Sequence, residues 1–195
     1  MKKSKGLITK ICFLAGACLI AVAAVIFALW QWNVNSARKS AEVYLQSLYD
    51  LMPTVEGAAV EERQNNAMPT LSVKDTDFVG IIEMPKYQSK LPVCAQWGKL
   101  TKYPCVFSGS VYDRTMKIGA TTQKGQYDFY KEISVGDALF FTDAQGNRYV
   151  YTVTDLHYKK QVQETDLNEN KSDLTLFLKN VYDFEYLVID CNVAE

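Results

Sequence analysis

The residues of this chain best suited to covalent chemistry are three cysteines and one histidine. Cys94, Cys105 and Cys191 lie in its C-terminal two-thirds, and His157 is the only histidine. A thiol becomes a nucleophile for acyl transfer when a nearby base or cation lowers its pKa. His157 lies in an expected strand, far along the sequence from all three thiols. We therefore interpret it as a side chain on a strand face, and the cysteines as small buried apolar residues.

The number and spacing of the cysteines and the single histidine also limit which other kinds of site the chain could form. Three is an odd number, so at least one of these cysteines has no disulfide partner among them; a Cys105–Cys191 disulfide is one arrangement that an oxidising compartment would allow. No two cysteines have CxxC spacing and no Cys/His cluster has the spacing of a zinc site, so we expect no metal and no cofactor. A net charge of -1 argues against nucleic acid as a partner.

The N-terminal region predicts a membrane anchor. Residues 11–30 carry no charge and would form a helix of about 30 Å, the thickness of a bilayer core. Lysines precede this segment, and Trp30 and Trp32 end it. We therefore expect a cytoplasmic tail over residues 1–10, a single transmembrane helix over 11–32, and the rest of the chain outside the cell membrane. A cleaved signal peptide is the alternative, although its apolar region is normally about 7–15 residues long.

The rest of the sequence divides into a connecting region and a folded domain. Residues 33–73 predict a helical stalk and then a linker with two prolines. Residues 74–195 predict a mainly β domain with a hairpin turn at Asp143–Asn147 and a helical turn at Asp128–Ile133. Eight short strands favour a closed barrel or a sandwich. The expected strands are Phe78–Glu83, Leu91–Gln96, Cys105–Ser110, Met116–Thr121, Ala138–Thr142, Arg148–Tyr158, Leu174–Lys179 and Tyr186–Asn192.

Four ordered segments of this domain resemble the sortases, the membrane-anchored cysteine transpeptidases of Gram-positive bacteria. They are FVGIIEMPKYQSKLPV (78–93), YPCVFSGSVYD (103–113), MKIGATTQKGQYDFYKEISVGDALFFTDAQGNRYVYTV (116–153) and LTLFLKNVYDFEYLVIDC (174–191). The predicted anchor and stalk also fit that family. The resemblance implies an eight-stranded sortase-like β-barrel with a groove for a sorting-signal peptide.

The sequence departs from the family at each position that carries its chemistry. The family has a histidine in a pattern like IAGHN, where this chain reads IGATT and has Thr121. Its cysteine nucleophile ends a strand like TLFTC, where this chain reads TLFLK and has Lys179. Its arginine opens a strand like RLVV, where this chain reads YLVI and has Tyr186. We therefore expect no catalytic residues of the sortase type, and we predict Thr121, Lys179 and Tyr186 as residues of a binding groove.

These substitutions leave three hypotheses for the function. The one we expect is a catalytically inactive, sortase-like pseudoenzyme that binds a peptide or protein partner of the surface-protein sorting or pilus machinery. Lys179 would then be a solvated lysine, or a fixed positive charge that attracts a carboxylate or an acidic partner. The second is an enzyme with altered chemistry, using Lys179 or a displaced thiol, although an ammonium has no lone pair with which to attack. The third is a purely structural interaction module.

Overall fold

The computed structural model describes residues 2–52, 67–100, 102–162, 171–181, 183 and 185–194, and only the backbone of residues 2–13, 30 and 33–41. The chain forms two compact units, Met1–Ala37 and Arg38–Glu195. Most of the predicted linker (53–66) and of the connection between Tyr158 and Leu174 (163–170) lies outside the described residues.

The first unit is helical. Helix α1 (Lys2–Leu51) forms it and continues into the second unit. In the described part of the first unit, large apolar side chains are exposed, namely Leu14, Leu19, Ile20, Val22, Val25, Ile26, Phe27, Leu29 and Trp32. The predicted span over residues 11–32 is not supported: among the described residues, no helix is long and apolar enough to cross a membrane. The side chains of residues 11–13 and 30 are outside those described.

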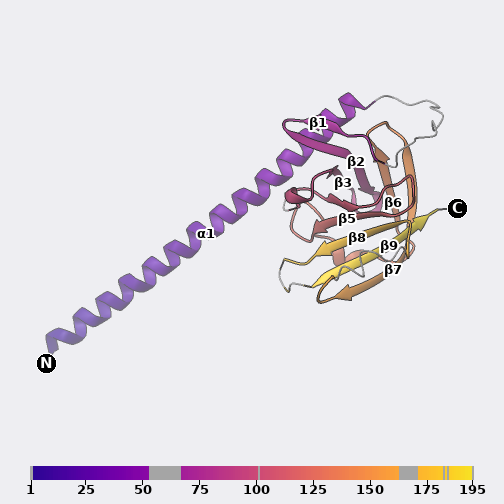
Figure 1. Cartoon of the computed structure of the whole chain (residues 1–195). Coiled ribbons are helices and arrows are strands. Elements are labelled where there is room, and N and C mark those ends of the chain that lie inside the picture. Colours follow the sequence, from indigo (N-terminus) through magenta and orange to yellow (C-terminus); the bar gives the residue numbers. More distant parts are fainter. Residues whose placement is uncertain are drawn as a thin grey trace. The chain divides into compact units, whose positions relative to one another are not determined.

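The second unit contains a closed β-barrel (Figure 1). Eight strands follow one another around it in the order β2-β3-β4-β5-β8-β9-β7-β6, and β6 pairs with β2 to close the ring. The prediction of an eight-stranded barrel is confirmed, and the short β1 beside β2 was missed. The strands are β1 (Leu71–Val73), β2 (Thr76–Met84), β3 (Ser89–Cys94), β4 (Cys105–Ser108), β5 (Met116–Thr121), β6 (Ala138–Asp143), β7 (Arg148–Lys159), β8 (Leu174–Lys179) and β9 (Tyr186–Val193).

Closure of the barrel requires a glycine in β2. Gly80 pairs with Val93 of β3 on one side and with Asp143 of β6 on the other. A Cβ atom at Gly80 would lie 2.1 Å from the carbonyl oxygen of Thr142. Because no real Cβ tolerates such a distance to backbone, only glycine lets β6 approach β2 here.

The two faces of each strand have different roles. On β5 and β8 the even-numbered residues, such as Met116 and Leu176, point into the main core, and on β9 the odd-numbered residues, such as Ile189, do so. The alternate residues of these three strands face the outside of the barrel. On β7 a bulge between Val153 and Asp155 shifts this alternation by one residue. As a result the second half of β7 presents its odd-numbered residues to the outer face.

A smaller core cluster joins the end of α1 to the barrel. Leu48 of α1 is fully buried with Phe78 of β2 and Tyr103, and Tyr44 packs its ring against both aromatic rings at 5.4 and 5.5 Å. This part of α1 therefore belongs to the same compact unit as the strands.

Three short 3-10 helices, η1 (Pro85–Tyr87), η2 (Trp97–Lys99) and η3 (Tyr130–Glu132), connect the strands, and η3 confirms the predicted helical turn. The carboxylate of Asp137 ties η1 to the segment after η3. It accepts hydrogen bonds from the Lys86 ammonium at 2.7 Å and from the Tyr87 hydroxyl at 2.5 Å. The backbone amide of Ser134 donates a third, at 2.9 Å.

These contacts predict a pH-dependent contribution to stability. Burial raises the pKa of Asp137, but the hydrogen bonds from Lys86, Tyr87 and Ser134 outweigh burial, so its pKa lies below the ordinary value. Its contribution is therefore complete above the unfolded pKa of about 3.9 and is lost as the pH falls through the lower folded value. Asp137→Asn should reduce the free energy of unfolding at pH 7 by about 1–3 kcal/mol.

Urea unfolding followed by circular dichroism between pH 7 and pH 3 measures this difference, which should narrow below about pH 4. The control is Asp128→Asn, an exposed acid nearby, which should change stability little at any pH. An Asp137→Asn effect that is constant across the pH range would show that the carboxylate charge is not its cause.

Candidate functional site

The three positions predicted from the family pattern lie side by side. Thr121 at the end of β5 is the register partner of Lys179 at the end of β8, and Lys179 is the register partner of Tyr186 at the start of β9. Lys159 of β7 continues the row as the partner of Tyr186. Directly paired residues project from the same face of a sheet. We call Thr121, Lys179, Tyr186 and Lys159 the end row, and it lies on the outer face at one end of the barrel.

The members of the end row differ in exposure. Lys179, Tyr186 and Lys159 are half-buried, whereas Thr121 is buried. The Thr121 hydroxyl has no hydrogen-bond partner among the described residues. A buried hydroxyl without a partner typically costs about 1–3 kcal/mol, so this position is not optimised for stability alone.

Two buried amides, which sequence reasoning missed, hold the ends of these strands. Gln126 accepts a hydrogen bond from the backbone amide of Thr121 at 3.0 Å and donates one to the carbonyl of Leu100 at 3.2 Å. Asn180, directly after Lys179, donates its side-chain amide to the hydroxyl of Tyr130 at 3.1 Å. No local pattern in the sequence indicates these partners, because they are brought together only by the fold.

An aromatic side chain covers the outer face next to Thr121. The ring of Trp97 in η2 lies over Gly119 of β5, where an added Cβ would come within 2.4 Å of it. Trp97 remains 44% exposed and meets Phe107 of β4 edge to face, with ring centroids 4.9 Å apart. The pair forms an apolar surface two residues along β5 from the end row.

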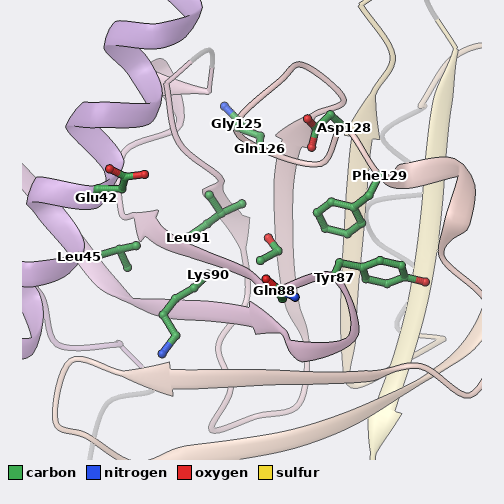
Figure 2. A pocket seen from close by; sticks show the side chains of 11 residues that line it. Glu42, Leu45, Tyr87, Gln88, Lys90, Leu91, Gly125, Gln126, Asp128 and Phe129 are labelled. Carbon is green, nitrogen blue, oxygen red and sulfur yellow. The ribbon is translucent and has the colours of Figure 1, made fainter.

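A pocket of about 360 Å³ lies beside the segment that follows β5 and contains Gln126 (Figure 2). Glu42 and Leu45 of α1 line one side, and the stacked rings of Tyr87 and Phe129, 4.5 Å apart, line the other. Gln126, which binds Thr121, lines it as well. The pocket is of the size that small ligands or single side chains of a partner occupy.

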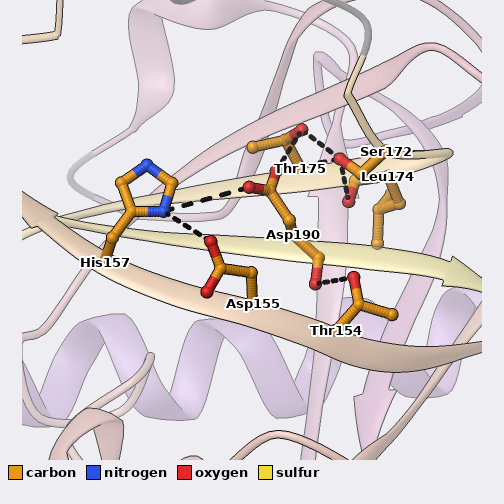
Figure 3. Close-up of polar contacts among 7 residues, drawn as sticks. All are labelled: Thr154, Asp155, His157, Ser172, Leu174, Thr175 and Asp190. Carbon is orange, nitrogen blue, oxygen red and sulfur yellow. Dashed lines mark hydrogen bonds and ion pairs between the residues drawn. The ribbon is translucent and has the colours of Figure 1, made fainter.

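His157 belongs to a polar cluster on the outer face (Figure 3). Its Nδ1 atom is 3.4 Å from the carboxylate of Asp155 and 3.9 Å from that of Asp190. The other Asp190 oxygen accepts hydrogen bonds from the hydroxyls of Ser172 at 2.9 Å and Thr175 at 3.2 Å. The prediction of a histidine on a strand face agrees with this position, and the bulge in β7 directs it outward.

The same cluster is the one place among the described residues with the ligand types of a metal site. Ligand atoms of Asp155, His157 and Asp190 lie within 4.8 Å of one another, so they could hold a divalent cation. Lys159 and Lys171 line the small cavity beside His157 and Asp190, and their positive charge disfavours a cation there.

The described thiols of the domain are all buried. Cys191 points into the main core, where burial raises its pKa, and Cys94 and Cys105 lie in the smaller core cluster. Because Cys105 and Cys191 are in different clusters, the Cys105–Cys191 disulfide is not formed. Among the described residues, the cluster around His157 contains no cysteine. His157 therefore does not form a catalytic pair with any of the three thiols.

Comparisons with known proteins identify the class of fold. No family model and no curated protein matches the chain. Among solved structures, sortase C1 of GBS pilus island 1 is 16% identical, with a TM-score of 0.53 over 83% of each chain. Sortase A from Corynebacterium diphtheriae is 13% identical, with a TM-score of 0.51 over 83% of this chain and 84% of that one.

A third structure is sortase C from Clostridium perfringens SM101, which is 17% identical, with a TM-score of 0.50 over 84% of this chain and 88% of that one. Identities this low show the fold alone. The second unit therefore has a sortase-like fold, as the four sequence segments predicted.

The close contact at Gly119 predicts an effect that can be measured locally. Gly119→Ala should displace the Trp97 ring, because the flexible ring moves more easily than the strand. In a background with Trp30→Phe and Trp32→Phe, Trp97 is the remaining tryptophan. Its emission should shift to longer wavelength and its quenching by acrylamide should increase.

The matched control is Gly98→Ala, where an added Cβ meets nothing within 4 Å. This variant should leave the emission of Trp97 unchanged. Identical spectra for Gly119→Ala and the parent would contradict the placement of Trp97 over β5.

Proposed function

We propose that this protein is a catalytically inactive sortase-like protein that binds a peptide or protein partner of the surface-protein sorting or pilus machinery. The observation that carries the proposal is the end row: Thr121, Lys179 and Tyr186 are register neighbours at the positions where the family has its histidine, cysteine and arginine. A threonine, an ammonium and a phenol supply neither a thiolate nor an imidazole for acyl transfer.

The geometry supports binding to an acidic or carboxylate-bearing partner. Lys179 and Lys159 are the two register partners of Tyr186, so this face offers two positive charges and one hydroxyl donor on adjacent strands. The apolar pair Trp97 and Phe107 lies nearby on the same side of β5. An extended peptide offers both a carboxylate and apolar side chains for such a surface.

One of the similar structures supports the choice of a peptide. Clostridium perfringens sortase C has been solved with the C-terminal cell wall sorting motif, and this chain is 17% identical to it with a TM-score of 0.50. A partner that carries such a motif is therefore the first to test.

Binding and cleavage can be tested together on the full-length chain. Fluorescent sorting-signal peptides should bind, as measured by anisotropy, and mass spectrometry should detect no cleavage or transfer to amine acceptors. Lys179→Ala should weaken binding by about 10- to 150-fold, since a hydrogen bond to a charged group contributes roughly 1.5–3 kcal/mol. Arg148→Ala removes an exposed positive charge at the other end of β7 and should leave binding unchanged.

The two other hypotheses give different results in the same experiment. Product that disappears in Lys179→Ala would make Lys179 catalytic and overturn the proposal. Partner binding that is insensitive to Lys179→Ala would favour a structural interaction module that does not use the end row.

We also propose that the protein is held at the cell membrane with its barrel outside. The support comes from the sequence, which has no charge over residues 11–30 and lysines before them. The exposed apolar side chains of α1 in the first unit add to it, because such a surface favours cover by lipid or protein.

This location predicts the behaviour of the chain in fractionated cells. The protein should sediment with membranes and stay there through an alkaline carbonate wash, and protease added to intact cells should degrade the barrel. Val22→Lys with Val25→Lys is the control, because two charges within the apolar segment should release the chain. Release of the unchanged chain by carbonate would refute the proposed location.

A further inference from the structure

The weakest seam of the barrel is the contact between β3 and β4. These parallel strands share a single pair of register partners, Cys94 and Cys105, whereas β5 and β8 share six. One additional backbone hydrogen bond, from the amide of Cys94 to the carbonyl of Pro104 at 2.8 Å, supports the seam. The two residues of this single register pair are both cysteines.

The geometry of this bridge suits a disulfide. Neighbouring strands lie about 4.7–4.9 Å apart, which is within the range of about 4.4–6.8 Å between the Cα atoms of a cystine. Register partners project from the same face, and both side chains are fully buried in the smaller core cluster with Phe78 and Tyr103. The Cys105 thiol donates a hydrogen bond to the carbonyl of Tyr103 at 3.3 Å, on the same buried side as Cys94.

The contact also differentiates the two thiols. The neighbouring Cys105 thiol lowers the pKa of Cys94 to about 7, and the proximity of Cys94 raises the pKa of Cys105. The amide of Gln96, 3.4 Å from the Cys94 sulfur, adds to the stabilisation of a thiolate. The Cys94 sulfur accepts a hydrogen bond from a backbone amide, whereas the Cys105 thiol donates its proton to the carbonyl of Tyr103 at 3.3 Å, so we expect Cys94 to be the attacking thiolate.

We propose that Cys94 and Cys105 are a disulfide-forming pair that covalently links β3 to β4. This inference does not depend on the proposed function of the end row. All three cysteines of the domain are free thiols in this structure, and linking Cys94 to Cys105 leaves only Cys191, which lies in the other core cluster, as a thiol.

The oxidant is a disulfide, either of a thiol–disulfide oxidoreductase or of a small molecule such as oxidised glutathione. The Cys94 thiolate attacks one sulfur of that disulfide, forms a mixed disulfide and releases one thiolate. Cys105 loses its proton, attacks the Cys94 sulfur and releases the second thiolate. Overall, two protein thiols lose two electrons and two protons, and one external disulfide becomes two thiols. Since both sulfurs are buried, the exchange takes place during folding or when the short seam opens.

Peptide mapping of the full-length chain tests the pairing directly. The chain is equilibrated in a series of reduced and oxidised glutathione buffers, quenched with acid, alkylated and digested with trypsin. Lys99 and Lys102 lie between the two cysteines, so Cys94 and Cys105 leave on separate peptides, 91–99 and 103–114, unless they are linked. We expect these two peptides joined, two hydrogen masses lighter than their sum, with Cys191 alkylated as a free thiol.

Two results would overturn the proposal: alkylation or separate glutathione adducts at both Cys94 and Cys105 in the most oxidising buffer, or a linkage that joins either of them to another cysteine. Both are read from the unmodified chain, so they do not depend on whether a variant folds.

A second measurement links the bond to stability. Reductant should lower the melting temperature of the oxidised chain by about 5–10 °C, given the usual stabilisation by a disulfide in a domain of this size. Cys94→Ala with Cys105→Ala should remove this sensitivity. Cys191→Ala, which changes a buried cysteine outside the seam, should keep it. The same response to reductant in the double variant would contradict the assigned pair.

Discussion

Closure of the barrel depends on the approach of β6 to β2 at Gly80, where a side chain would collide with the backbone of Thr142. This contact makes a ring out of what would otherwise be an open, twisted sheet with two unpaired edges. Once the ring is closed, β5, β8, β9 and β7 are neighbours with a fixed register. The end row follows from that register and not from any contact among its own side chains.

The strands could be predicted from the sequence because each is a short run rich in apolar residues that is bounded by turn residues. The bounds of β5 and β8 agree fully with the prediction, since both are buried on their two faces and end abruptly. β1 could not be recognised, because three residues are too short to show an alternation. The bulge in β7 could not be predicted from the sequence either, because it is defined by the pairing of β7 with β9. That pairing determines that His157 lies on the outer face.

The sequence singled out three of the four residues of the end row, but not their surroundings. The family pattern located Thr121, Lys179 and Tyr186, and the register brings them together. The roles of Gln126 and Asn180 depend on partners distant in sequence, so they required the fold. The sequence left a Cys105–Cys191 disulfide open for a related reason: spacing along the chain does not reveal which core cluster a cysteine enters.

The end row lies on the outer face of the barrel, whereas the alternate residues of the same strands form its core. Replacement of the half-buried Lys179, Tyr186 or Lys159 would leave the packed interior intact, so the groups presented at this strand end and the residues that hold the fold are separate positions. Such an arrangement allows an evolutionary lineage to exchange its reactive groups while the scaffold persists under independent selection. The same separation makes this barrel a suitable frame for engineering, in which reactive or ligand-binding groups are introduced along one edge without redesign of the core.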